Sequence, residues 1–499
     1  MAEAIDTKKE NSYKQSLKAT SLFGGVQIFN ILIQIIRSKF AAVLLGPEGM
    51  GIMGLLNSTI TMISSFTNCG LGTSAVRNIA EANSTNDIRR ISLIISVFRR
   101  LVWITGLLGA LICLISASYL SQMTFGNTDY TFAFIILSVS ILLMQLTSGQ
   151  NALMQGMRKY RYLAMANVVG NGIGLAFIIP LYYLWGINAI VPVLLISNVL
   201  IFILAYTYAR KIKVDKTNIT IADLKIEGRD MLKMGILISL QGILSILASY
   251  VIRIFISRIG SINDVGLFNA GFTIVNTYVG LVFTAMATDY YPRLSAIASD
   301  NKEFVKVINQ QAEISLLLLA PIIIAFIAYI RVAVVLLYST KFIPVEGMMY
   351  WAMAAMFFKA MAWSMSYGLL AKGASKVFFW NEFVTVCYGL VFNMVGYYYW
   401  GLIGLGISSF IKYGLYFLQL WIICHRKCEL EFNRSIIKLF VLFSCITAVV
   451  LVCKVLMSGW TSYAIVTAFL ILTGYYSYVG LDQRIGIRQA ITHKFRRKN

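Results

Sequence analysis

Long apolar runs, separated by short polar segments, follow one another along the whole chain. A helix of about 20 apolar residues crosses the hydrocarbon core of a bilayer, so each run predicts a transmembrane helix. The expected helices lie at 19–43, 51–73, 98–120, 131–153, 162–184, 187–208, 234–257, 267–289, 310–331, 347–370, 377–399, 401–424, 437–457 and 460–480. The pattern predicts an all-α integral membrane protein with about 14 transmembrane helices and no separate soluble domain.

The second half of this pattern repeats the first at an offset of about 215 residues. The matched positions are Leu17-Lys18 with Leu232-Lys233, Arg37 with Arg253, Leu45-Gly46 with Ile259-Gly260, Gly51 with Gly266, Arg77 with Arg293, Arg90 with Lys306, Gly156 with Gly373, Trp185-Gly186 with Trp400-Gly401, and Arg210-Lys211 with Arg426-Lys427. Because six is an even number of spans, both copies insert in the same direction, as in carriers built from parallel repeats. We expect an N-terminal six-helix lobe at 1–208, a cytoplasmic linker at 209–233, a C-terminal six-helix lobe at 234–424, and two further helices with a basic tail at 425–499.

Composition agrees with this prediction and directs the interpretation of the charge. The chain is 58% apolar and 13% charged, against roughly 45–50% and 25% in soluble domains. The net charge of +22 is compatible with nucleic-acid binding, but most Lys and Arg residues fall in the termini and alternate loops. The opposite loops contain only Arg258, Arg331, Lys341 and Lys454. By the positive-inside rule both termini are cytoplasmic, and the charge reflects topology and attraction to anionic membrane lipids, with no nucleic acid as partner.

The chain lacks the groups that catalysis or metal binding needs. Its two histidines, His425 and His493, lie at cytoplasmic ends, and it has no Walker motif, Ser–His–Asp arrangement or carboxylate cluster. The seven cysteines are odd in number and lie mostly within predicted helices, which argues against a disulfide framework. Cys424 and Cys428 lack a second pair of ligands. We therefore expect no enzyme activity, no cofactor and no metal.

Five basic residues within predicted helices are the candidate binding residues. Lys359 and Lys412 are central in their helices, whereas Arg37, Lys39 and Arg253 lie nearer to the outer interface. A cation at the bilayer centre costs at least about 2.5–3.5 kcal/mol. These side chains therefore either extend to the interface or line a positive cavity that binds an anion, such as a phosphate or pyrophosphate.

Four further charged residues leave two interpretations each. Arg99 and Arg100 begin a helix on the cytoplasmic side and are either interface anchors or a patch where cargo enters. Glu382 is either a proton or sodium site or an interfacial carboxylate. Asp289 is a second candidate for ion coupling, but it precedes Arg293 by four residues, which is the spacing of a helical ion pair.

Three stretches resemble a known family: LLGPEGMGIMGLLNSTITMISSFTNCGLGTSAVRNIAE, VGLFNAGFTIVNTYVGLVFTAMATDYYPRLSAIASDN and LLAKGASKVFFWNEFVTVCYGLVFNMVGYYYWGLIGLGIS. They are similar to Wzx-type O-antigen and capsule flippases of the multidrug/oligosaccharidyl-lipid/polysaccharide exporter superfamily. The resemblance implies two six-helix lobes around a cationic cavity in the bacterial inner membrane. It implies a polyprenyl-pyrophosphate-linked oligosaccharide as cargo, H⁺ or Na⁺ as coupling ion, and glycan polymerase machinery as a partner.

Two other functions remain alternatives. A cation-coupled drug or metabolite exporter of the same superfamily would need acidic pockets, whereas the excess charge within these helices is basic. A membrane enzyme of glycan assembly, such as a polymerase or ligase, would need larger extramembrane loops. The sequence therefore favours a lipid-linked oligosaccharide flippase that works by alternating access.

Overall fold

The computed structural model describes residues 2–85, 87–212, 214, 220–457 and 459–485, and their regular elements are all helices. A helix satisfies its backbone N–H and C=O groups within one segment, which the hydrocarbon core of a membrane requires. Ten helical runs of the described chain are long and apolar enough to cross a membrane. The chain is therefore an all-α integral membrane protein, as the sequence predicts.

The chain divides into two compact units, residues 1–266 and 267–499. The first unit contains α1 (Ala2–Asn68), α2 (Leu71–Thr85), α3 (Ile88–Ile115), α4 (Ala117–Phe125), α5 (Thr131–Gly156), α6 (Tyr160–Trp185), the short 3₁₀ helix η1 (Gly186–Ala189), α7 (Ile190–Ala209) and α8 (Ile221–Ile259). Helix α9 (Ile262–Ile274) begins in this unit and continues into the next. The predicted lobe and linker boundaries rest on the sequence repeat and stay a prediction.

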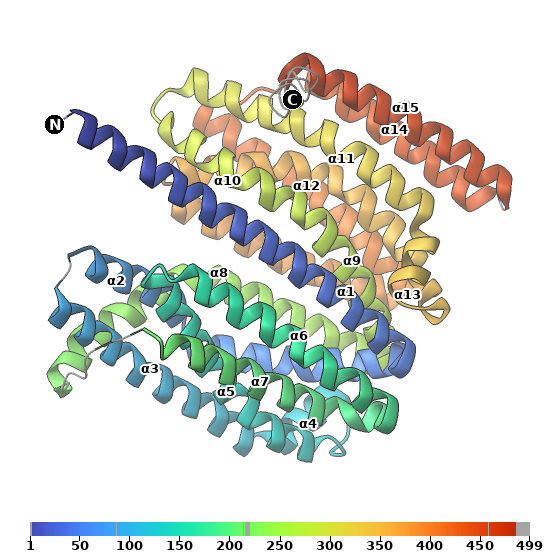
Figure 1. The fold of residues 1–499 in the computed structure, drawn as a ribbon. Helices are drawn as coiled ribbons and strands as arrows, with labels where there is room; N and C mark the ends of the chain where they lie inside the picture. Colours follow the sequence, from blue (N-terminus) through green and yellow to red (C-terminus); the bar gives the residue numbers. More distant parts are fainter. Residues whose placement is uncertain (1, 86, 213, 215–219, 458, 486–499) are drawn as a thin grey trace, which may run out of the picture. The chain divides into compact units, whose positions relative to one another are not determined.

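The second unit continues with η2 (Val275–Val279), a π-helical turn, and then α10 (Gly280–Ala296), α11 (Asn301–Leu337), η3 (Thr340–Val345), α12 (Glu346–Ala371), α13 (Ser375–Cys428), α14 (Arg434–Leu456) and α15 (Trp460–Ile485). Figure 1 shows α14 and α15 as an antiparallel pair, and both pack on α11. Tyr329 of α11 and Thr467 of α15 share a hydrogen bond of 2.7 Å between their hydroxyls. Near the other end of α11, Glu313 accepts hydrogen bonds from Ser435 and Arg484. The C-terminal hairpin is thus attached to α11 at two levels.

The predicted spans fall on these helices. Three of the long helical runs contain two predicted spans each, divided by Gly46 in α1, by η1 between α6 and α7, and by Gly401 in α13. The predicted span 347–370 is α12. The apolar pattern therefore located the helices, and breaks at Gly46, η1 and Gly401 divide the longest runs.

The duplication is visible in local backbone geometry. Gly186 has φ 55° and ψ −130°, and its repeat partner Gly401 has φ 56° and ψ −138°. This conformation is open to glycine and strained for other residues, so it explains the Trp-Gly pair at both corners. Asp87 and Asp300 also correspond, because each caps its helix, α3 or α11, by accepting two backbone N–H bonds.

One sequence pairing of the repeat is displaced by two residues. Between α5 and α6, Arg158 N–H donates to Gln155 C=O and Lys159 N–H donates to Met154 C=O. Between α12 and α13, Gly373 N–H donates to Leu370 C=O and Ala374 N–H donates to Leu369 C=O. The structural partner of Gly373 is therefore Arg158, not Gly156. Both have positive φ, 56° for Arg158 and 68° for Gly373.

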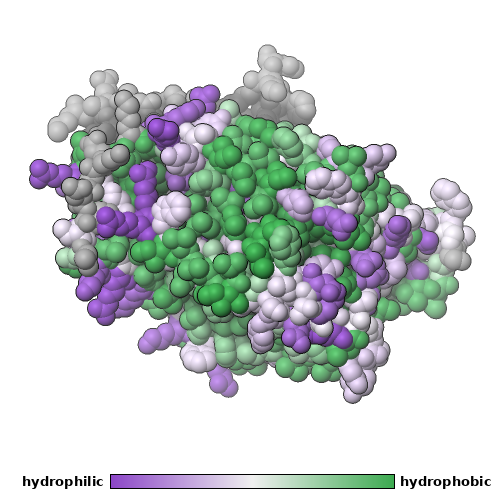
Figure 2. Space-filling view, turned by 90° about the horizontal axis from the view of Figure 1, so that it is seen from below, coloured by the Kyte–Doolittle hydropathy of each residue, from purple (hydrophilic) through white to green (hydrophobic). Residues whose placement is uncertain are grey.

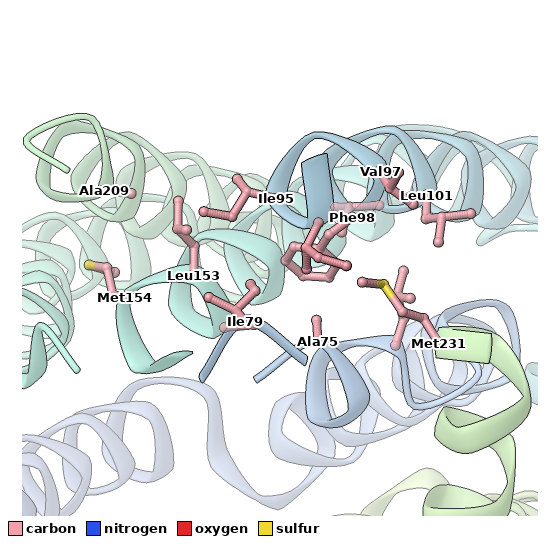
Figure 3. Packing of buried hydrophobic residues seen from close by; sticks show 14 of the residues in the cluster. Ala75, Ile79, Ile95, Val97, Phe98, Leu101, Leu153, Met154, Ala209 and Met231 are labelled. Carbon is pink, nitrogen blue, oxygen red and sulfur yellow. The ribbon is translucent and has the colours of Figure 1, made fainter. Parts of the chain in front are cut away.

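The core of the first unit lies between α2, α3, α5, α7 and α8. Figure 3 shows Phe98 and Ile95 of α3 packed against Ile79 of α2 and Leu153 of α5. Met231 of α8 reaches the same cluster and is fully buried. In the second unit, a corresponding cluster joins α10, α11, α12 and α13.

The surface is largely apolar, as expected for a protein that is surrounded by lipid. Large apolar side chains are exposed along many helices, including Leu107 and Leu111 of α3 at 46% and 51%. Figure 2 shows apolar residues over broad areas, with hydrophilic residues gathered in separate groups. Such continuous apolar patches are too large for a water-soluble monomer and fit contact with lipid chains.

Arg158→Gly should stabilise the first unit. A left-handed conformation costs a residue with a side chain about 1–2 kcal/mol, and glycine avoids most of that cost. We expect Arg158→Gly to raise the free energy of unfolding by about 1 kcal/mol, measured as a higher melting temperature in detergent. The matched change Gly373→Arg should lower the melting temperature. Shifts in the same direction for both variants would contradict the assigned correspondence.

Candidate functional site

Two lysines of the second unit converge on one tyrosine. Lys359 of α12 has its Nζ 5.3 Å from the ring centroid of Tyr413 on α13, and Lys412 has its Nζ 4.5 Å from the same centroid. The Lys359 ammonium also lies 5.5 Å from the Phe283 ring of α10. Aromatic faces attract cations within about 6 Å, by up to about 2 kcal/mol where water is excluded. The rings therefore stabilise two positive charges that the membrane disfavours.

A carboxylate joins this group. Glu382 of α13 accepts a hydrogen bond from the Tyr416 hydroxyl, and Ser366 of α12 also interacts with Tyr416. The Tyr413 hydroxyl is close enough to Lys359 for a hydrogen bond, and the charges of Lys412 and Glu382 act on it. Lys359, Lys412 and Glu382, predicted separately, thus form one cluster with Tyr413 and Tyr416, which we name the lysine–tyrosine cluster.

Helix α13 brings these residues together because it folds back at Gly401. Residues at similar distances on either side of this glycine face each other. The pairs are Gly396 with Gly404, Phe392 with Ser408, Gly389 with Lys412, Glu382 with Tyr416, and Asn381 with Gln419. A Cβ on Gly404 would lie 1.8 Å from the Gly396 carbonyl oxygen, so only glycine permits this approach. The Gly401-x-x-Gly404-x-Gly406 stretch is thus tightly packed at Gly404.

Gly389 makes room for the Lys412 side chain. A Cβ at this position would lie 2.6 Å from Cδ of Lys412. The lysine stem therefore runs directly over the glycine of the facing half of α13. Because the obstructed atom belongs to a flexible side chain, a larger residue would redirect Lys412 more easily than it would unfold the helix.

An aromatic group continues from the cluster between α10 and α12. The rings of Phe283 and Trp363 have centroids 5.5 Å apart, and Trp363 and Tyr367 are 4.9 Å apart. Tyr290 is fully buried behind Trp363 and donates a hydrogen bond of 2.8 Å to the Ser364 carbonyl. The cluster is thus bordered by rigid aromatic side chains.

The predicted basic residues of the first unit have other surroundings. Arg37 of α1 interacts with the Tyr182 hydroxyl of α6. Arg253 of α8 donates a 2.7 Å hydrogen bond from Nη1 to the Ser249 carbonyl oxygen, one turn earlier in the same helix. Lys39, close to Arg37 along α1, is half-buried. Arg37 and Arg253 both belong to the first unit, and these contacts are made to different residues.

The remaining candidates, Asp289, Arg99 and Arg100, are exposed and lie within α10 and α3. Asp289 of α10 is 83% exposed and forms an ion pair with Arg293 at 4.0 Å, as the spacing indicates. Arg99 and Arg100 were expected to begin a helix, but α3 begins at Ile88, so both lie near its middle, and both are exposed. Arg99 lines a pocket between α3, α5 and α7, whereas Arg100 is not among its lining residues. In the described part of the chain, no group of three His, Cys, Asp or Glu residues could hold a metal.

Tyr413, Tyr416 and Phe283 were not predicted from the sequence. Tyr413 and Tyr416 follow Lys412 by one and four residues, so a helical face shared by Lys412 and Tyr416 was detectable. The contact between Phe283 and Lys359 was not detectable in the sequence, because it depends on how α10 packs against α12.

Fold and cluster together define a multi-pass helical membrane protein with paired charges at membrane depth, a feature typical of transporters. Residues 16–298, more than half of the chain, match the polysaccharide biosynthesis protein family, and the chain belongs to this family. It is 25% identical over 422 residues to the "Putative O-antigen transporter" of Shigella flexneri, covering 81% of this chain and 96% of that protein.

Solved structures show the same fold. An inward-facing multidrug resistance MATE family transporter of the MOP superfamily aligns with a TM-score of 0.70 at 16% identity, covering 81% of this chain and 94% of that one. The lipid II flippase MurJ in an inward closed conformation aligns with a TM-score of 0.66 at 14% identity, covering 94% and 99%. The protein therefore has the fold of the MOP superfamily, as its sequence resemblance implies.

Gly389→Ala should impair transport with little loss of stability. The added methyl group displaces the Lys412 stem from its place over α13, while the helix gains a residue of higher helix propensity. We expect at least a tenfold loss of transport rate and a melting temperature close to wild type. Gly414→Ala, on the same helix with open space around its Cβ, is the control. Equal transport by both variants would show that the position of Lys412 is unimportant.

Proposed function

We propose that this protein flips a polyprenyl-pyrophosphate-linked oligosaccharide, an O-antigen or capsule repeat unit, from the cytoplasmic to the periplasmic leaflet of the bacterial inner membrane. It does so by opening alternately to the two sides, with both of its termini in the cytoplasm. The family and the O-antigen transporter relative support this choice of cargo. The observation that carries the proposal is the convergence of Lys359 and Lys412 on Tyr413.

Two lysines suit a pyrophosphate that must be bound and then released. An ammonium group is a flexible point charge with three donors, whereas an arginine fork fixes the orientation of a phosphate. Each charge-assisted hydrogen bond contributes about 1.5–3 kcal/mol. Two such bonds offset part of the cost of removing the pyrophosphate from water, while the lipid tail stays in the bilayer. Arg37, Lys39 and Arg253 of the first unit complete the proposed anion-binding set.

The membrane potential favours this direction of transport. Moving one charge across 100 mV changes the free energy by about 2.3 kcal/mol. The cytoplasm is the negative side, so an anionic headgroup moves outward down the electrical gradient. A binding site that is positive when empty and neutral when loaded returns inward down the same gradient. The excess of basic over acidic residues at membrane depth is therefore suited to export of an anion.

Glu382 is the proposed coupling carboxylate, with Asp289 as the less suitable candidate. Glu382 lies in the lysine–tyrosine cluster, so H⁺ or Na⁺ binding there would cancel a negative charge beside Lys359 and Lys412. Asp289 is exposed and paired with Arg293. Arg99 and Arg100 belong to the cytoplasmic side, where cargo and the glycan polymerase machinery would be met.

A cation-coupled drug exporter is the alternative, favoured by the fold shared with the multidrug transporter. Such a pump selects cationic substrates, and a cluster with two lysines and one carboxylate repels them. The electrostatics of the second unit therefore favour an anionic cargo.

Removal of either positive charge of the cluster should weaken cargo binding. Lys359→Gln and Lys412→Gln should each weaken binding of a polyprenyl-pyrophosphate glycan at least tenfold, because a charge-assisted bond of about 1.5–3 kcal/mol is lost. The measurement combines a binding titration with glycan display in a strain that depends on this gene. Lys341→Gln, which removes an exposed charge in the short helix η3 between α11 and α12, is the control. Full glycan display by both variants at wild-type protein levels would remove the two lysines from the site.

Glu382→Gln should separate binding from turnover. The amide still accepts the Tyr416 hydrogen bond but carries no charge, so the lysines bind the pyrophosphate at least as tightly as in wild type. We expect flipping in proteoliposomes to lose its response to imposed H⁺ or Na⁺ gradients. Glu303→Gln, which removes an exposed carboxylate paired with Lys306, is the matched control. A wild-type gradient response in Glu382→Gln would exclude this residue from coupling.

A further inference from the structure

A basic pocket of the first unit lies apart from the lysine–tyrosine cluster, between α3, α5 and α7. Its volume is about 500 Å³. Arg99 of α3, Arg210 at the end of α7 and Gln150 of α5 supply its polar lining. Trp103 and Tyr206 also line it. Three helices thus bring two guanidinium groups, an amide and a phenol to one cavity.

The apolar side of this pocket is the core of the unit. Phe98 and Leu153 line the pocket and are each 1% exposed. Both belong to the packed cluster of Figure 3. A cavity backed by such a core keeps its shape without a ligand.

The two guanidinium groups lack a carboxylate partner within the described residues. Arg90, nine positions before Arg99 on α3, illustrates the contrast, because it forms an ion pair with Glu227 of α8. No such pair is formed by Arg99 or Arg210 in the described part of the chain. Two like charges that share a cavity repel each other, and an anion between them removes this repulsion. Arginine forks bind phosphate oxygens with two parallel hydrogen bonds.

The depth of the pocket identifies the anion as part of a lipid. Trp103 and Tyr206 are 50% and 46% exposed, and such rings gather at the membrane–water interface. From Trp103 an exposed apolar stripe continues along α3 through Leu107 and Leu111, each one turn further into the membrane. A soluble anion would make no use of this stripe. An acyl chain beneath a phosphate would cover it.

We propose that this pocket binds an anionic phospholipid of the leaflet that the positive-inside rule assigns to the cytoplasm. The phosphate lies between Arg99 and Arg210, Gln150 and Tyr206 donate to its remaining oxygens, and an acyl chain lies along α3. Basic pockets between membrane helices are a recurring place for anionic headgroups. The bound lipid would hold the middle of α3 against the end of α7, which favours one arrangement of the first unit. This proposal does not depend on the identity of the transported cargo.

Native mass spectrometry of the delipidated full-length protein tests the site. Phosphatidylglycerol, the anionic probe, should bind wild type at least tenfold more tightly than the variant Arg99→Gln/Arg210→Gln. Arg100→Gln removes the same charge one position along α3, outside the pocket, and should bind the probe like wild type. Zwitterionic phosphatidylcholine should not compete. Equal phosphatidylglycerol binding by wild type and the double variant would overturn the proposal.

Two further arms identify the source of the phosphate and guard against misfolding. Millimolar inorganic phosphate should leave the lipid bound, whereas displacement would indicate a soluble-anion site and overturn the proposal. Preferential binding of polyprenyl phosphate over phosphatidylglycerol would overturn it in favour of a cargo site. Arg99→Lys/Arg210→Lys keeps both charges but loses the bidentate geometry, so its affinity should lie between those of wild type and the double Gln variant. Affinity no higher than that of the Gln variant would contradict a role for charge at this site.

Discussion

In the hydrocarbon core of a membrane, every polar backbone group and every charge costs free energy unless the protein supplies a partner for it. This constraint explains the helical fold and the few places where helices change direction. At Gly401 the chain turns back in a conformation suited to glycine, and Gly396 and Gly404 then bring the two halves of α13 into contact. Ser408 donates a hydrogen bond to the Phe392 carbonyl oxygen across that contact, so both polar groups have a partner within the protein.

The same hairpin determines where charge can be placed. Once the halves of α13 are antiparallel and in close contact, Glu382 and Tyr416 meet, and Lys412 passes over Gly389. Lys359 then needs only the neighbouring α12 to reach Tyr413. A backbone turn that solves a packing problem thereby assembles a polar cluster from residues more than 50 positions apart. The cost of placing each lysine in the membrane is reduced by rings and a carboxylate that the fold brings to it.

The apolar pattern alone was sufficient to predict the helical spans. The repeated Trp-Gly pair was also visible in the sequence, and the structure explains it, because Gly186 and Gly401 share one backbone conformation. The exact correspondence of the two copies was not predictable from the sequence, because Arg158 occupies the position that Gly373 has in the other copy. The charged residues at membrane depth were found from their cost. Their grouping into the lysine–tyrosine cluster could not be predicted, because the contact of Lys359 with Tyr413 depends on the packing of α12 against α13. The spacing of residues along the chain does not encode that packing.

The two structural units surround their basic residues differently. In the first unit Arg253 donates to the carbonyl of its own helix, and Arg37 interacts with a buried tyrosine, so both guanidinium groups have partners on the protein. In the second unit the lysines lie against aromatic faces, which attract a cation without occupying its three donors. The donors that do not contact the Tyr413 hydroxyl stay available to phosphate oxygens. A flexible ammonium can also follow a ligand while helices move around it, whereas a fork that is already bonded to the backbone cannot. Duplication therefore supplied the frame, and divergence of the second copy supplied the residues that are chemically suited to bind and release an anion.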